Sequence, residues 1–282
     1  GAIFQPVRWF SATADYYNVK KSNLIVAGPL AGKAVTNYYS VSGNSYASAA
    51  LAQAAGCAAV AATGAGYSCN LVDAVDPLFP NAIPRLLIIN APFVNVNSDK
   101  TEGVDVSATV NFPIGDIKFT SRVEGTYVIR YDRMTSDGVQ KFAGTLGPYD
   151  LSSGNGTPRI RGNWQNTIDL GSYALSATAY FTGRIKEVAT DQGSLDTSCA
   201  ANLYKTADLS KFCYVNSFIN VDVNQSFKVN DKFTFYFNVL NILNARAPVA
   251  PAAYASAPNF LTTWHYAGLI GRQFRAGASF RF

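Results

Sequence analysis

Hydrophobic and polar residues alternate with a period of two along much of the chain, which is the pattern of a β-strand with one apolar face. The alternation is clearest in six segments, at residues 104–112, 117–131, 173–181, 219–227, 233–239 and 274–282. It is weaker at residues 7–25 and 160–170. The pattern predicts an all-β protein with about eight antiparallel strands.

Charged side chains keep to the polar face of these strands. In the six clear segments they are Asp105, Lys118, Arg122, Glu124, Arg130, Asp222, Arg275 and Arg281. A charge that faces lipid at mid-membrane costs about 2–4 kcal/mol, so a transmembrane barrel enforces such a rule. A soluble β-sandwich also alternates, because its inner faces are apolar.

The lengths of the connections distinguish these two folds. Short links near residues 113–116, 170–172 and 229–232 alternate with long links near 27–84, 132–157, 189–213 and 245–266. All long links therefore lie at one end of an up-and-down sheet, as in outer-membrane barrels, whereas sandwiches mix connection lengths at both ends. We predict a transmembrane antiparallel up-and-down β-barrel in a bacterial outer membrane.

Composition narrows the choice further. The 282 residues carry a net charge of +5, with 15% charged and 13% aromatic residues, so the chain is too apolar for disorder. The scattered Lys and Arg argue against a nucleic-acid partner. A single His and the absence of a G-x-S-x-G motif argue against an enzyme and a His-based metal site, and we expect no cofactor.

Four cysteines fall into two close pairs, Cys57 with Cys69 and Cys199 with Cys213. Four cysteines allow three pairings, and the local one is the natural choice here. Both pairs lie in long links without metal-ligand spacing, which predicts two disulfides in an oxidising compartment. Free buried thiols are the alternative.

Four stretches resemble the TonB-dependent outer-membrane receptor family. They are residues 6–19 (PVRWFSATADYYNV), 95–105 (NVN followed by TEGVD), 237–244 (FNVLNILN) and 271–282 (GRQFRAGASFRF). Each stretch alone is weakly specific, but all four occur in the order of the family and span nearly the whole chain. The last resembles the C-terminal signature of the family, which implies that Phe280 and Phe282 signal to the barrel-assembly machinery.

The resemblance implies a barrel of about 22 strands filled by an N-terminal plug. Residues 1–282 then form only the C-terminal portion of that barrel, without plug or TonB-contacting segment. The chain begins without Met or a signal segment, so we expect the rest of the barrel and the plug in a longer polypeptide. The implied function is uptake, coupled to the TonB complex, of a scarce nutrient such as a siderophore, vitamin or oligosaccharide.

Candidate site residues follow from the polar face and the loops. The residues expected to face the lumen are Lys118, Arg122, Glu124, Arg130, Asp105 and Asp222, and a solvated wall of paired charges is the plain alternative for each. The residues expected to face ligand are Tyr38, Tyr39, Tyr46 and Tyr67, in an uncharged link over 34–72 in which they otherwise pack the loop on itself.

The membrane itself is the remaining expected partner. Arg272 lies towards the outer rim, where it either meets lipopolysaccharide phosphates or is turned inward by a bulge. An alternative function is a complete eight-stranded outer-membrane barrel with a structural or adhesion role. Such a narrow barrel must fill its interior with side chains. Many predicted inward residues are small, which favours part of a wide barrel.

Overall fold

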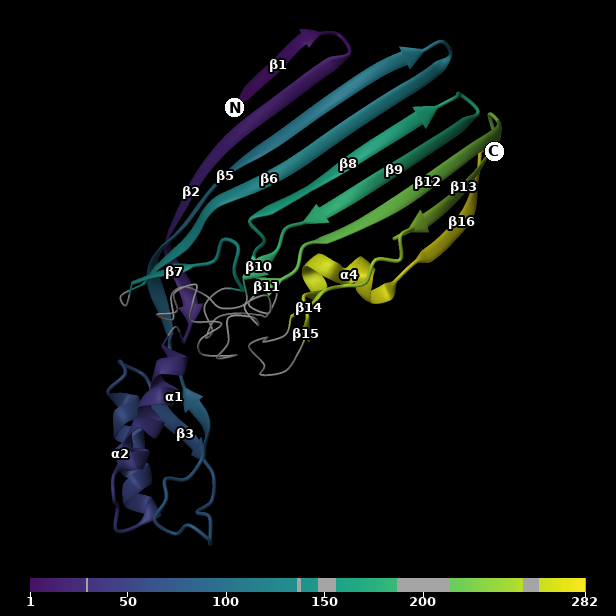
Figure 1. Ribbon diagram of the computed structural model, residues 1–282. Coiled ribbons are helices and arrows are strands. Elements are labelled where there is room, and N and C mark those ends of the chain that lie inside the picture. Colours follow the sequence, from purple (N-terminus) through teal and green to yellow (C-terminus); the bar gives the residue numbers. More distant parts are fainter. Residues whose placement is uncertain (29, 136–137, 147–155, 187–213, 251–258, 282) are drawn as a thin grey trace, which may run out of the picture.

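A computed structural model describes residues 1–28, 30–135, 138–146, 156–186, 214–250 and 259–281. They contain a ten-stranded antiparallel sheet in the order β1-β2-β5-β6-β8-β9-β12-β13-β16, with β7 paired to β6 (Figure 1). Its strands are β1 (Ala2–Val7), β2 (Phe10–Ala27), β5 (Phe93–Ile114), β6 (Ile117–Thr135), β7 (Gly138–Lys141), β8 (Ile160–Asp169), β9 (Tyr173–Thr182), β12 (Phe218–Asn230), β13 (Phe233–Leu240) and β16 (Gln273–Phe280).

The up-and-down topology is confirmed, because the strands on the path lie side by side in the order in which they follow one another along the chain. The path has one strand more than the predicted eight, since residues 2–7 form a separate strand that pairs with β2. Figure 1 shows the short turns at one end of the sheet and the long connections at the other. Gly115 (φ 62°) and Gly171 (φ 82°) supply the left-handed backbone that two of the short turns need. No described helix is long and apolar enough to cross a membrane.

The register carries the predicted faces unbroken across the strands, because directly opposed residues share a face. Ala108, Val123 and Trp164 form one row across β5, β6 and β8 on what we call the apolar face. The adjacent row on the other side, the polar face, joins Thr109, Arg122 and Gln165, and the row after it joins Ser107, Glu124 and Asn163. The prediction of which residues in these segments lie on the apolar face and which lie on the polar face is confirmed.

Arg130 is the exception. A bulge in β6 shifts the register between Glu102 and Gly103, so that Gly103 opposes Val128 but Glu102 opposes Arg130. Glu102 lies on the apolar side with Val104, and the bulge therefore moves Arg130 to that side. The predicted inward position of Arg130 is wrong, because simple alternation does not include the extra residue, Ile129.

The apolar face is open along the described strands. Val123, Trp164 and Phe235 are each about half exposed, at 47%, 55% and 48%. Aromatic rings meet at the short-turn end, where the centroids of Trp9 and Phe112 lie 6.4 Å apart. A sandwich would bury this face against a second sheet, so the arrangement is that of a barrel wall.

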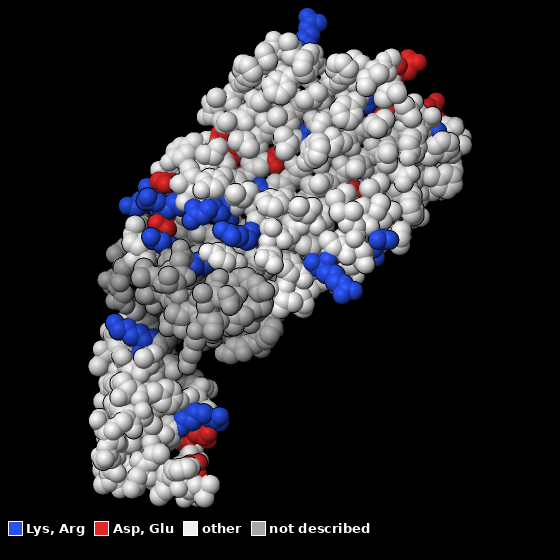
Figure 2. Space-filling model, in the orientation of Figure 1, with Lys and Arg blue, Asp and Glu red and all other residues white. Residues whose placement is uncertain are grey.

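The link between β2 and β5 folds into a lobe, which we define as residues 30–92. It contains α1 (Ala31–Ser40), the 3-10 helix η1 (Val41–Gly43), α2 (Ala49–Ala61), β3 (Ser68–Val72) and β4 (Leu86–Asn90). The prediction of a loop over residues 34–72 is therefore wrong, because most of this segment folds into helices and a strand. Figure 1 shows the lobe beyond the long-connection end of the sheet, and Figure 2 shows that it carries few charged side chains.

The lobe has its own core, around Ala34, Tyr38, Val60 and Tyr67. Cys57 and Cys69 form the predicted disulfide and pack against this core, with Cα atoms 5.5 Å apart. Cys199 and Cys213 lie outside the described residues. The lobe is thus stabilised both by burial and by a cross-link that restricts its unfolded state.

Gly56 lets α2 approach α1 closely. A Cβ atom there would lie 2.7 Å from a ring carbon of Tyr38, whose hydroxyl is fixed by donating to the carbonyl of Pro84 at 2.8 Å. Helix propensity favours replacing the glycine by up to about 1 kcal/mol, but overpacking costs about 1–3 kcal/mol.

We expect Gly56→Val to destabilise the lobe by about 1–3 kcal/mol, and Ala54→Val on the exposed side of α2 to cost less than about 1 kcal/mol. Thermal unfolding followed by proteolysis within residues 30–92 measures both, and equal effects would contradict the packing argument.

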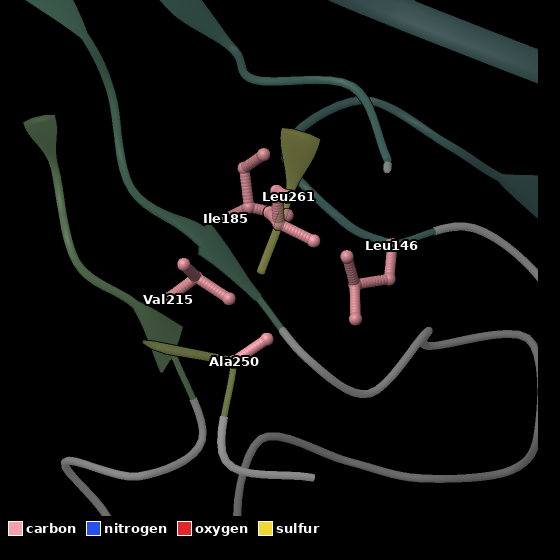
Figure 3. Packing of buried hydrophobic residues seen from close by; sticks show 5 residues of the cluster. All are labelled: Leu146, Ile185, Val215, Ala250 and Leu261. Carbon is pink, nitrogen blue, oxygen red and sulfur yellow. The ribbon is translucent and has the colours of Figure 1, made fainter. Parts of the chain in front are cut away.

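The other long connections meet in a second core. Leu146, Ile185, Val215, Ala250 and Leu261 come from separate segments and point toward one another (Figure 3). The short strands there are β10 (Ile185–Lys186), β11 (Tyr214–Val215), β14 (Val249–Ala250) and β15 (Asn259–Phe260), followed by helix α4 (Thr262–Ile270). This core holds α4 at the outer end of the sheet.

Candidate functional site

A basin of about 750 Å³ lies on the polar face, under α4. Its lining residues come from β2, β5, β6, β8, β9, β12 and α4, and the polar ones include Asp15, Tyr17, Asp105, Glu124, Thr126, Arg161, Asn163, Tyr180 and Asn220. The side chains reach it because every second residue of each strand points to the same side. Strand alternation alone therefore assembles a polar surface from six strands.

Three carboxylates line the basin together with the guanidinium of Arg161. Asp15 and Asp105 oppose each other directly on β2 and β5. Asp105 accepts a hydrogen bond of 2.7 Å from the Thr126 hydroxyl. Glu124 pairs with Arg122 on its own strand and accepts from the Asn163 amide at 3.3 Å. The basin thus offers carboxylate, amide and hydroxyl groups to a polar solute or to a polypeptide that fills the space.

Helix α4 adds an aromatic ring at the edge of the basin. The guanidinium of Arg161 lies 5.8 Å from the centroid of the Trp264 ring, and the indole N–H donates to the carbonyl of Gly156 at 3.1 Å. Trp264 also packs against the second core. The helix is therefore fixed to the outer connections on one side and to the polar face on the other.

Asn241 holds α4 in this place, and the sequence analysis assigned it no role. It is fully buried with a φ of 49°, a conformation that Asn tolerates better than most residues. Its amide donates to the carbonyls of Ala245 and Ala267, at 2.9 and 3.0 Å, and Asp222 accepts from its backbone N–H at 2.8 Å. The recurring Asn in FNVLNILN was the available signal.

His265 is a buried residue of α4. Its side chain is fully covered, its ring packs 5.3 Å from that of Phe218, and neither ring nitrogen has a hydrogen-bond partner among the described residues. Burial lowers the pKa of His265 to about 4. The neutral imidazole therefore acts as a packing group between α4 and β12.

The residues predicted to face the lumen share the polar face apart from Arg130. Asp105 and Glu124 line the basin. Lys118 opposes Asp169 near the short turns, and Arg122 pairs with Glu124. Asp222 supports the turn at Asn241. Their contact with a transported solute stays a prediction.

The structure divides the predicted ligand-facing tyrosines. Tyr38 and Tyr67 are core residues of the lobe, and the Tyr67 hydroxyl accepts from the N–H of Leu30 at 2.9 Å. The prediction is wrong for these two, because their rings fill space between the helices. Tyr39 is 38% exposed and Tyr46 is partly exposed, and they remain candidates.

The groups that line the basin suit binding. Within the described ranges, no group of three or more His, Cys, Asp or Glu side chains could hold a metal ion. The basin combines hydrogen-bonding groups with aromatic side chains, namely Tyr17, Tyr180, Phe181 and Trp264, which suits polar recognition.

Comparisons with known proteins find no matching family model and no matching curated protein. Similar solved structures include the siderophore receptor PirA from Acinetobacter baumannii, with 12% identity and a TM-score of 0.49. A mutant of the ferric enterobactin receptor PfeA from Pseudomonas aeruginosa has 13% identity and a TM-score of 0.48. The iron transporter FrpB from Neisseria meningitidis has 12% identity and a TM-score of 0.47.

Each similarity covers 99% of this chain but only 30% of the other chain. The three are TonB-dependent outer-membrane receptors, which is the family that the sequence motifs resemble. With identities of 12–13% and TM-scores below 0.5, these likenesses carry no argument about function.

Proposed function

We propose that this chain is the C-terminal part of the transmembrane barrel of a TonB-dependent outer-membrane receptor, which takes up a scarce nutrient. The observation that carries the proposal is the apolar face that runs across the strands of an up-and-down sheet whose other face is polar. Lipid-facing and lumen-facing residues alternate in this way in outer-membrane barrels. The long connections and the lobe then lie outside the cell, in an oxidising space that suits the Cys57–Cys69 disulfide.

The open edges support a larger barrel. β1 and β16 end the path on opposite sides, and in the described residues they pair only with β2 and β13. An unpaired edge in lipid costs several kcal/mol per backbone group. We infer that further strands close the barrel, and that a plug and the TonB-contacting segment belong to the same receptor. The alternative, a complete eight-stranded barrel, needs its first and last strands to pair and is not favoured.

The C-terminal strand has a proposed role as well. Phe280 is 62% exposed on the apolar face, and its ring lies 4.5 Å from that of Phe233. The exposed ring of Phe280 on β16, packed against Phe233 of β13, supports the predicted signal to the barrel-assembly machinery. Phe282, the other predicted signal residue, lies outside the described residues.

Two tryptophans on opposite faces test the membrane assignment. Trp164 is exposed on the apolar face, whereas Trp264 lines the basin. The emission of each tryptophan is the difference between the wild type and its Trp→Phe variant, measured in the full-length receptor reconstituted in lipid. The emission of Trp164, obtained from Trp164→Phe, should be quenched by brominated acyl chains. The emission of Trp264, obtained from Trp264→Phe, should not be quenched by brominated lipid. If Trp164 is instead quenched only by aqueous iodide, the apolar face does not contact lipid and the proposal fails.

Uptake tests the transport part separately. Cells that carry or lack the intact gene are grown with single ferric chelates, cobalamin or oligosaccharides, each with and without a protonophore. The proposal expects one nutrient class whose uptake needs both the gene and the proton-motive force. Uptake that persists without the proton-motive force would contradict energy coupling, even if the barrel lies in the outer membrane.

A further inference from the structure

The apolar face ends in charge at its outer edge. From Phe112 to Val104, β5 presents apolar residues over about the nine positions that a strand needs to cross hydrocarbon. Tyr16 and Tyr127 flank Val104 on the neighbouring strands and are exposed. Aromatic rings at this position mark the interface of a membrane barrel, so the residues beyond them lie at the level of the lipid headgroups.

Two polar rows follow directly on the same face. The first joins Asn18, Glu102 and Arg130 across β2, β5 and β6. The second row runs across β2, β5, β6 and β7 and consists of Lys20, Lys100, Asp132 and Lys141. Figure 2 shows charged side chains gathered at the end of the sheet that adjoins the lobe. Four cations therefore stand beside two carboxylates, and the β6 bulge contributes one of the cations, Arg130.

The cations are not fully neutralised by their neighbours. Lys100 lies 2.6 Å from Glu102, and Arg130 lies 3.6 Å from Glu102 and 3.7 Å from Asp132. Lys20 directly opposes Lys100, an arrangement that like charges disfavour unless an anion joins them. Lys20 and Lys141 are exposed and form no ion pair within the described part of the chain.

We propose that Lys20, Lys100, Arg130 and Lys141 bind the phosphates of a lipopolysaccharide headgroup in the outer leaflet. The inference rests on the proposed function, since it needs the apolar face to contact lipid. Clusters of Lys and Arg next to a membrane bind anionic headgroups, with about 1 kcal/mol from each basic side chain. The rows lie on the face that contacts lipid, directly beyond the hydrocarbon, and this position selects a lipid headgroup over a phosphate dissolved in water.

The test uses the full-length receptor extracted in detergent, with lipid A carrying both phosphates as the probe in native mass spectrometry. The double variant Lys20→Gln/Lys141→Gln should bind the probe about 30-fold more weakly than the wild type, because two cations worth about 1 kcal/mol each are lost. Lys21→Gln is the matched control, since Lys21 opposes Asp99 on the polar face, and it should bind like the wild type. Lys20→Arg/Lys141→Arg should restore binding.

Three results would overturn the inference. They are wild-type affinity in the double glutamine variant, equal affinity for dephosphorylated lipid A, or displacement of the probe by inorganic phosphate at similar concentrations. If the glutamine variant does not fold, the salt dependence of the wild type is measured instead. Binding of lipid A by the wild type that does not weaken with added salt would also overturn the inference. Membrane fractionation separates the two proposals, because a wild type absent from the outer membrane refutes the proposed function, whereas unchanged lipid binding in an outer-membrane protein refutes only this site.

Discussion

Val123→Arg should destabilise the barrel by about 2–4 kcal/mol, the cost of a basic side chain at the middle of the lipid-facing surface. Val123 lies midway along the apolar rows of β6, between Ala108 and Trp164, and is 47% exposed. An arginine there has no carboxylate beside it on the same face. Its nearest strand neighbours, Arg122 and Glu124, point to the opposite side.

Ser107→Arg is the matched control. Ser107 lies at nearly the same depth but on the polar face, where it directly opposes Glu124. The new arginine therefore meets a carboxylate and water, and we expect a change below about 1 kcal/mol. Urea unfolding in lipid vesicles, followed by the mobility of folded and unfolded protein on gels, measures both variants. Equal losses would show that the two faces have similar surroundings, which a membrane barrel excludes.

The faces of the sheet were predictable because a charge on the apolar side of a strand is costly within the hydrocarbon. Alternation and the position of Asp105 and Glu124 were enough to assign them. Arg130 was not predictable in this way, since the bulge changes the face of the residues beyond Ile129 without interrupting the alternation in the sequence. Only the pairing of β5 with β6 reveals that Arg130 joins Glu102.

The lobe was harder to predict for a different reason. Its tyrosines are amphipathic, so the sequence does not distinguish a tyrosine that packs in a core from one that binds a ligand. The spacing of Ala49, Ala52, Gly56 and Val60 is that of one helix face, and these four residues are buried. That spacing was the available sign that the Ala-rich segment packs against something, and that nearby tyrosines are its core.

The fold of the outer connections should weaken as the pH falls from about 6.5 to about 4, through His265. An exposed imidazole has a pKa near 6.5, and burial lowers the pKa of His265 to about 4. Within this window the unfolded chain binds the proton and the folded chain does not, so stability decreases as pH falls. At about 1.4 kcal/mol for each pKa unit, the loss is about 3 kcal/mol when the pH reaches 4. Above pH 6.5 both states are neutral and His265 has no effect.

Trp264 reports this change, because it adjoins His265 and packs against the second core. Urea unfolding followed by Trp264 fluorescence, with Trp264→Phe as the blank, should show the loss in the wild type. His265→Leu keeps an apolar group against Phe218 but cannot titrate, so the part of the pH dependence due to the imidazole should disappear. All other titrating groups are present in both proteins and cancel in the comparison. A variant with the pH dependence of the wild type would mean that the imidazole reaches water and accepts its proton without leaving the contact between α4 and β12.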